Sequence, residues 1–386
     1  MSGFDAARRA FVPGPATPTL AVIHLYLYSL RPSQSTMVLA HQGITNTHIQ
    51  NSTVLPTPND IKQLLPLSDR AERTVLGFRS QLENILDGKD HRQFVVVGPC
   101  SIHDVDAAID YARRLRVLAD KVSDRLLLVM RVYFEKPRTT IGWKGLINDP
   151  NLDDSFDVEK GIKLARKLLV EIAEIGLPSA TEALDPIIPQ YISDLITWSA
   201  IGARTIESQT HREMASGLSM PVGLKNGTNG NIGVALNALK AARGAHSFLG
   251  INAMGQVSVF STSGNPYAHI ILRGGGGETN YEPEKIQAVE EQIRAAGLTP
   301  RLAIDCSHGN SNKDHTRQGG VFNNIIDQVR SGNQSIVGMM LESNLNPGNQ
   351  CITPDLKDLK YGVSVTDKCL GWEETESLLM EAYHRL

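Results

Sequence analysis

Short apolar runs alternate with helix-like segments along most of the chain, and this repetition limits the possible folds more than any other feature. The run 94–100 is apolar throughout, as in a parallel strand that is covered on both faces. Asp104 then offers a helix N-cap, and apolar residues follow at helical spacing as far as Val122. The predicted strands are 94–100, 126–133, 178–184, 201–206, 221–226, 268–274, 302–306 and 336–342.

Eight strand–helix units predict an α/β fold, a (β/α)8 TIM barrel, whose active site would lie at the carboxyl ends of the strands. An open doubly wound sheet is the alternative. The usual dinucleotide fingerprint is missing, because the glycine run 274–277 follows a strand but does not lead into a helix. Two further apolar runs, 246–252 and 256–262, predict an inserted β-hairpin.

The N-terminal part differs in composition from the barrel. Residues 1–36 are rich in Pro, Ser and Ala without a helical period, and we expect a disordered extension. Residues 37–93 are expected to form an arm followed by helices at 58–65 and 68–86. The catalytic barrel would then occupy 94–386, with the hairpin at 246–262.

Composition excludes several classes of partner. The net charge of −3 over 386 residues argues against a nucleic-acid surface. No apolar run reaches the roughly 18 residues needed to span a membrane, although a cleaved signal peptide at 20–30 is an alternative. The four cysteines have no paired spacing, which favours a reducing, cytoplasmic location.

Each predicted strand delivers a polar or ionisable residue at or just beyond its carboxyl end. In chain order these residues are Cys100, Arg131, Glu182, Arg204, Lys225, Arg273, His308 and Glu342. Random loops would not place a chemically useful side chain at every strand end. The set divides into metal ligands and anion-binding cations.

The first group offers a thiolate, an imidazole and a carboxylate from Cys100, His308 and Glu342, with Asp367 as a fourth ligand. Such a set suits a divalent transition metal (Mn2+, Fe2+, Co2+ or Zn2+) better than magnesium or calcium. Taken alone, Cys100 is as well explained as a small buried apolar residue, and His308 as a histidine of the core, as either is by a metal ligand. Their joint position at strand ends favours the metal.

The second group contains four cations and no paired carboxylate. Their charges would repel one another unless an anion normally lies among them, which predicts an anion site formed by Arg131, Arg204, Lys225 and Arg273. Salt bridges to Glu182 or Glu207 are the structural alternative.

The loop 131–140 adds Lys136, Arg138 and two threonine hydroxyls around the rigid Pro137. Arginine suits bidentate contact with carboxylate or phosphate, so the loop predicts a second anion beside the first. A solvated basic loop is the alternative.

These motifs resemble those of class I (type Iα) 3-deoxy-D-arabino-heptulosonate 7-phosphate (DAHP) synthases, closest to the tyrosine-sensitive branch. The similarity extends from about Thr45 to about Tyr383. The stretches that carry it are 98–104, 131–140, 142–150, 201–205, 225–228, 271–274, 305–308 and 342–344.

The resemblance implies a transferase that condenses phosphoenolpyruvate with erythrose 4-phosphate and water, the first step of the shikimate pathway to aromatic amino acids. It implies a divalent metal on Cys100, His308, Glu342 and Asp367. Phosphoenolpyruvate would lie on Arg131, Glu182, Arg204, Lys225 and Arg273, and erythrose 4-phosphate on Lys136, Arg138 and Thr139.

Lys136, Arg131 and His308 are the expected catalytic residues. The metal would polarise the aldehyde oxygen and the cations would stabilise developing charge. Lys136 is our candidate for proton transfer at the aldehyde, because surrounding cations should lower its pKa.

The resemblance also implies an allosteric pocket, built from the arm and the hairpin across a subunit contact of a homodimer or homotetramer. The matching positions are Asn46, Pro186, Gln190, Ser219 and Phe248, with tyrosine as the expected effector. Two alternatives stay open, a 3-deoxy-octulosonate 8-phosphate synthase that uses arabinose 5-phosphate and a non-catalytic sensor of aromatic amino acids.

Overall fold

The computed structural model describes residues 44–386, and contacts divide the chain into two units that meet at Val54 and Leu55. Of the first unit, residues 44–54 are described. All of them are exposed, and the Ile49 amide donates to the Asn46 carbonyl at 3.0 Å. The extension expected at 1–36 lies outside the described residues. The division between 37–93 and 94–386 stays a prediction.

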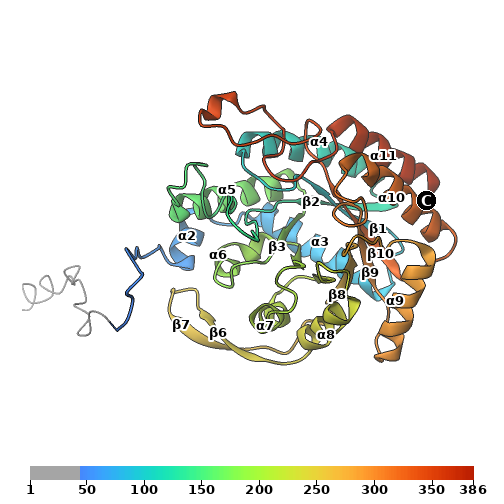
Figure 1. The fold of residues 1–386 in the computed structure, drawn as a ribbon, viewed down its shortest axis with the longest axis horizontal. Coiled ribbons are helices and arrows are strands. Elements are labelled where there is room, and N and C mark those ends of the chain that lie inside the picture. Colours follow the sequence, from blue (N-terminus) through green and yellow to red (C-terminus); the bar gives the residue numbers. More distant parts are fainter. Residues whose placement is uncertain (1–43) are drawn as a thin grey trace, which may run out of the picture. The chain divides into compact units, whose positions relative to one another are not determined.

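The second unit contains a closed barrel of parallel strands in the order β1-β10-β9-β8-β5-β4-β3-β2, which confirms the TIM-barrel prediction (Figure 1). The strands are β1 (Gln93–Gly98), β2 (Leu126–Arg131), β3 (Ser179–Glu182), β4 (Trp198–Ile201), β5 (Val222–Lys225), β8 (His269–Leu272), β9 (Leu302–Asp305) and β10 (Ile336–Glu342). Every residue of these strands is buried, as their continuous apolar runs require.

Helices surround this barrel (Figure 1). They are α2 (Pro58–Leu64), α3 (Asp69–Asp87), α4 (Val105–Val122), α5 (Val158–Ile175), α6 (Pro189–Ile192), α7 (Gln209–Gly217), α8 (Ile232–Arg243), α9 (Pro283–Ala295), α10 (Gln318–Arg330) and α11 (Trp372–Arg385). The Asp104 side chain accepts from the Ala107 amide at 3.0 Å, so it caps α4 as predicted. Gly176 ends α5 in the left-handed conformation at φ 87°.

Large side chains fill the interior of the barrel. Phe94 packs against Trp198 with ring centroids 6.2 Å apart, and the Trp198 indole donates to His269 Nε2 at 3.2 Å. Gly338 makes room for this layer, because a Cβ there would lie 2.5 Å from the Phe94 ring. Residues of α3 join the same cluster, and the Leu86 carbonyl accepts from Arg301, just before β9. The amino-terminal end of the barrel is thus filled, which leaves the carboxyl ends for a site.

One strand prediction is wrong in its position. Strand β4 spans Trp198–Ile201, whereas 201–206 was expected. The chain turns at Gly202, whose carbonyl accepts from the Thr205 amide at 3.1 Å. A Cβ at Gly202 would lie 2.1 Å from Glu182 Oε1, so glycine lets the turn pass this carboxylate. Arg204 therefore lies in an exposed turn beyond the strand end.

The inserted hairpin is confirmed as β6 (Ser247–Ile251) paired antiparallel with β7 (Val257–Ser261). It lies along α7 and α8 at the outside of the barrel (Figure 1). The Ser216 and Thr262 hydroxyls, 2.7 Å apart, tie it to α7. Among residues 44–386 there is no helix with the length and apolar character of a membrane span.

Candidate active site

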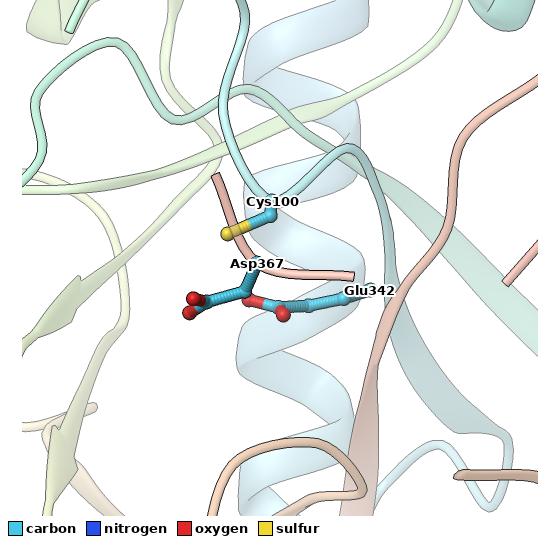
Figure 2. A group of neighbouring side chains, drawn as sticks. All are labelled: Cys100, Glu342 and Asp367. Atoms are coloured by element: carbon cyan, nitrogen blue, oxygen red, sulfur yellow. The ribbon is translucent and has the colours of Figure 1, made fainter. Parts of the chain in front are cut away.

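Three predicted metal ligands converge at the carboxyl end of the barrel. Cys100 follows β1, Glu342 ends β10, and Asp367 lies in the loop before α11. The Cys100 sulfur and one carboxylate oxygen each of Glu342 and Asp367 lie within 4.8 Å of one another (Figure 2). These separations make the three side chains a candidate ligand group for a single ion, although the atoms must draw slightly closer together to reach metal–ligand bonds of about 2.0–2.3 Å.

The fourth predicted ligand, His308, lies in the loop after β9, near Glu342 but outside this group of three. Its backbone has a φ of 54°, an uncommon conformation for a residue other than glycine. Nε2 lies 4.0 Å from Glu342 Oε1, whereas Nδ1 faces away, 2.9 Å from Asp305 Oδ2. The ring thus presents one nitrogen to the metal ligands and the other to a carboxylate.

Burial and charge govern protonation at these ligands. Burial and the Glu342 carboxylate raise the pKa of the Cys100 thiol, although Lys136 and Arg131 oppose this shift. Burial also disfavours the Asp367 carboxylate, but Lys136, His308 and Arg131 outweigh it and lower the pKa of Asp367. A thiol and two carboxylates in one group, with the imidazole of His308 near Glu342, fit a divalent transition metal.

Glu342 is held from two sides. Its backbone amide donates to Gln318 Oε1 at 2.8 Å, and its carbonyl accepts from Gln318 Nε2 at 3.0 Å. Its carboxylate accepts from Arg131 Nη2 at 2.9 Å. Sequence reasoning missed Gln318, whose position just before two glycines hid the start of α10.

The expectation that the four cations lack carboxylate partners is wrong for two of them. Arg131 pairs with Glu342, and Lys225 Nζ donates to Asp305 Oδ2 at 2.8 Å. Glu182 and Glu207, the partners considered from sequence, are not the ones used. The actual partners come from β10 and β9, far away in sequence, so only the closed barrel reveals these pairs.

The other two cations are more open. Arg204 is exposed, and its Nε donates to the Thr139 hydroxyl at 3.2 Å, which links it to the 131–140 loop. Arg273 is half-buried beyond β8, and its amide donates to Asn226 Oδ1 at 2.8 Å. Arg138 is exposed and donates to the Trp143 carbonyl at 2.8 Å.

Lys136 contacts one of the predicted metal ligands, Cys100, directly. Its Nζ lies 3.2 Å from the Cys100 sulfur and 3.1 Å from the Cys100 carbonyl oxygen. Burial lowers the pKa of this lysine, but the Cys100 sulfur and Glu342 outweigh burial and Arg131, and the net shift is upward. The expected lowering of the Lys136 pKa is therefore wrong, because Cys100, Glu342 and Glu182 together outweigh burial and the neighbouring Arg131.

A carboxyl cluster lies beside this loop. Burial, followed by Asp185 and Glu182, raises the pKa of Glu135 to about 8. The buried Glu182 Oε1 has no hydrogen-bond partner among the described residues. Sequence reasoning selected Glu182 but missed Glu135, although Glu135 immediately precedes Lys136 in the loop.

The predicted allosteric residues are brought together only in part. Pro186, Gln190 and Phe248 line one open pocket between the segment after β3, α7 and the hairpin. Ser219 is exposed and does not line this pocket. Asn46 belongs to the first unit of the chain.

Fold and site together define a (β/α)8-barrel protein that carries a candidate metal group of one thiol and two carboxylates beside buried cations. Residues 63–380 match the model of the DAHP synthetase I family. The chain belongs to this family.

Individual relatives agree with the family match. The chain is 56% identical over 344 residues to "Phospho-2-dehydro-3-deoxyheptonate aldolase, Tyr-sensitive" of Escherichia coli K12, covering 89% of this chain and 96% of that protein. It is 51% identical to a Trp-sensitive relative from Enterobacter agglomerans, covering 86% and 96%. The solved structure of a phospho-2-dehydro-3-deoxyheptonate aldolase from Francisella tularensis SCHU S4 superposes with a TM-score of 0.85 at 48% identity, covering 87% of this chain and 98% of that chain.

Proposed function

We propose that this chain is a DAHP synthase, which condenses phosphoenolpyruvate with D-erythrose 4-phosphate and water to give DAHP and phosphate. The observation that carries this proposal is the position of Glu342. This one carboxylate belongs to the metal-ligand group and also accepts from the buried Arg131. An anionic substrate bound by Arg131 and its neighbouring cations would therefore lie directly beside a substrate oxygen bound to the metal ion.

Phosphoenolpyruvate fits the inner set of cations, formed by Arg131, Lys225, Arg273 and Arg204. The first two are buried and fixed by carboxylates, whereas the last two have fewer partners and remain free to hold phosphate oxygens. Glu182 lies at the end of β3, beside the proposed phosphoenolpyruvate site, and its buried Oε1 lies against Gly202 without a hydrogen-bond partner among the described residues.

Erythrose 4-phosphate fits the outer set, Lys136, Arg138 and Thr139. Arg138 and Thr139 are exposed, as residues that meet a phosphate arriving from solvent should be. Lys136 is the buried end of this set, next to the Cys100 sulfur. Its raised pKa keeps it an ammonium, so it can donate a proton rather than accept one.

Cys100, His308, Glu342 and Asp367 would hold the divalent ion, which when bound supplies Lewis-acid polarisation of a carbonyl oxygen. Manganese, iron, cobalt and zinc all suit this ligand set.

The reaction balances with these residues in place. The C3 carbon of phosphoenolpyruvate forms a bond to the aldehyde carbon, and the aldehyde oxygen takes a proton, for which Lys136 is the donor. Water adds to C2 and loses one proton, which restores the proton that Lys136 has given up. The bond between C2 and the phosphate oxygen then breaks, the C2 hydroxyl becomes the ketone, and its proton leaves with the released phosphate. Arg131, Lys225 and Arg273 stabilise the charge on the carboxylate and phosphate oxygens throughout.

The test is release of inorganic phosphate by the purified chain with both substrates. We expect phosphate only when both are present, and loss of release on adding a chelator that divalent metal reverses. Arabinose 5-phosphate in place of erythrose 4-phosphate should give little or no release. Turnover with the five-carbon aldose, or none with either aldose in metal-loaded protein, would contradict the proposal.

We propose tyrosine as a feedback inhibitor that binds the pocket of Pro186, Gln190 and Phe248. Higher identity to the Tyr-sensitive relative than to the Trp-sensitive one supports this choice. Pro186 lies a few residues after Glu182 on the segment that leaves β3, so a ligand there would act on the carboxylate that we place beside phosphoenolpyruvate. Asn46 and Ser219 would complete the site. Inhibition by phenylalanine or tryptophan but not by tyrosine would contradict this assignment.

We propose a homodimer or homotetramer. Leu249, Val257 and Val259 of the hairpin are 69%, 80% and 66% exposed, an unusual apolar face for a free surface. Light scattering on a sizing column should report a multiple of 42.1 kDa. Val259→Lys should shift the protein toward monomer, and a wild-type protein that is monomeric would contradict the proposal.

We also propose a cytoplasmic location. The four cysteines are free, and Cys100 must stay reduced to bind metal. Fractionation of cells that express the chain would test this location.

A further inference from the structure

Asp305 is a buried carboxylate at the end of β9 that was not among the predicted site residues. It is 1% exposed. Its Oδ2 lies 2.8 Å from Lys225 Nζ and 2.9 Å from His308 Nδ1. Its Oδ1 accepts from the Ser307 amide at 3.0 Å and from the Ser307 hydroxyl at 2.6 Å. Both oxygens are thus fixed, and one of them touches two functional side chains.

These contacts decide which nitrogen of neutral His308 carries the proton. The Ser307 hydroxyl gives its one hydrogen to Asp305, so its oxygen, 2.7 Å from Nδ1, can only accept there. The carboxylate of Asp305 also accepts. Nδ1 must therefore hold the hydrogen, which leaves the lone pair on Nε2, the nitrogen that faces Glu342.

The same carboxylate oxygen holds Lys225 in place. Lys225 ends β5, is 4% exposed, and donates to Asp305 through a charge-assisted hydrogen bond. Its ammonium is thereby neutralised within the fold and kept at one position in front of the anion site. Without Asp305, a buried lysine would have neither a fixed direction nor a counter-charge.

We propose that Asp305 is a positioning residue for both halves of the site, because it orients His308 toward the metal and Lys225 toward the anion. The proposal rests on the proposed function only in taking phosphoenolpyruvate as that anion. A carboxylate behind a metal-bound histidine is a recurrent support for metal affinity. The sharing of its oxygen with a substrate-facing lysine is particular to this arrangement.

The test is Asp305→Asn, assayed by two binding measurements. Affinity for Mn2+ is measured on metal-free protein by competition with a chelating dye, and phosphoenolpyruvate binding by calorimetry at saturating Mn2+. We expect the dissociation constant for Mn2+ to rise about 10- to 100-fold. We expect that for phosphoenolpyruvate to rise about two- to tenfold, as for loss of one anchoring hydrogen bond.

Asp194→Asn is the matched control, because Asp194 pairs with the buried Arg166 at 2.8 Å away from this site. It should change neither constant by more than about twofold. If Asp305→Asn does not fold, Ser307→Ala decides, since it removes only the hydroxyl that touches both Asp305 and His308. It should weaken Mn2+ binding about two- to tenfold.

Unchanged Mn2+ affinity in Asp305→Asn, or in Ser307→Ala where only that variant folds, would overturn the proposal. If Asp305→Asn binds Mn2+ more weakly but phosphoenolpyruvate as tightly as the unaltered protein, Asp305 does not position Lys225 for the anion. Both are binding measurements, so they stay separate from a failure of the proposed function, which would show as no phosphate release by unaltered, metal-loaded protein.

Discussion

Arg131 Nη2 donates to Glu342 Oε1 at 2.9 Å, and the two side chains are only 2% and 4% exposed. This ion pair joins the cation cluster to the metal-ligand group inside the barrel mouth. A buried pair of this kind is costly to break, because removal of one partner leaves an uncompensated charge. The buried Glu342 carboxylate therefore needs a positive charge beside it, either the Arg131 guanidinium or a bound metal ion.

Arg131→Met should destabilise the metal-free protein by about 3–5 kcal/mol, since Glu342 loses its buried partner. Bound Mn2+ should recover more of this loss than it adds to the unaltered protein, because the ion supplies the missing positive charge. Chemical unfolding with and without Mn2+ measures both effects.

Arg166→Met is the control for this prediction. Arg166 is equally buried and pairs with Asp194 at 2.8 Å, but contributes nothing to the metal-ligand group. The Arg166→Met variant should have a lower free energy of unfolding than the unaltered protein, and Mn2+ should not restore this loss. Equal recovery in both variants would argue against a link between Arg131 and the metal.

Metal affinity should rise with pH. Burial raises the pKa of the Cys100 thiol above its ordinary value of 9.0, so the metal-free protein keeps this proton at neutral pH. The metal must displace it, and loss of one proton strengthens apparent affinity about tenfold per pH unit. The rise should continue to about pH 9, as measured by dye competition.

Cys100→Ser provides the comparison, because a serine hydroxyl has no thiolate to release. This variant should bind metal more weakly and with a shallower dependence on pH. Affinity of the unaltered protein that does not vary above about pH 7 would show that Cys100 is not a ligand.

Glu135 should make the protein less stable at alkaline pH. Its pKa is about 8 in the folded chain, above the ordinary value of 4.5. The unfolded chain thus binds fewer protons between these values, so the stabilisation is complete below about pH 4.5 and is lost as the pH rises through 8. The expected slope from this group reaches about 1.4 kcal/mol per pH unit.

Glu135→Gln should remove that slope, because glutamine stays neutral at every pH. Urea unfolding of both proteins at about pH 6 and about pH 8.5 tests this, since the variant should gain stability relative to the unaltered protein at the higher pH. A constant difference between the two proteins would mean that Glu135 ionises normally.

Phe248→Ala should release the enzyme from tyrosine without loss of basal turnover. Phe248 lines the proposed effector pocket and packs against Phe260 with centroids 5.9 Å apart, away from the metal ligands. Loss of an aromatic contact should weaken tyrosine inhibition at least about tenfold. Val117→Ala, on the exposed side of α4 and outside the hairpin, should keep full sensitivity. Full inhibition of Phe248→Ala would place the effector elsewhere.

The barrel could be predicted because its signals are local. Continuous apolar runs, the cap at Asp104 and the stop at Gly176 each depend on a few neighbouring residues. The strand at Trp198–Ile201 was misplaced because the reason for its end, the Glu182 carboxylate against Gly202, comes from another strand.

In the candidate site, too, features that depend on nearby residues could be predicted, and contacts between distant strands could not. Residues at strand ends could be selected from sequence because the fold class decides where strand ends lie. The pairs Arg131–Glu342 and Lys225–Asp305 could not, since they join strands distant in sequence. The pKa of Lys136 was predicted in the wrong direction for this reason, because its nearest neighbours are the Cys100 sulfur and carbonyl rather than cations.

In our view the metal ion and the phosphoenolpyruvate-binding cations form one site, because Glu342 belongs to the metal-ligand group and also pairs with Arg131. Anomalous scattering from crystals grown with Mn2+ and phosphoenolpyruvate tests it most directly. The account predicts one strong metal peak within about 2.5 Å of Cys100 Sγ, His308 Nε2 and carboxylate oxygens of Glu342 and Asp367, with phosphoenolpyruvate against Arg131 and Lys225. A main metal peak elsewhere, or phosphoenolpyruvate away from these cations, would contradict it.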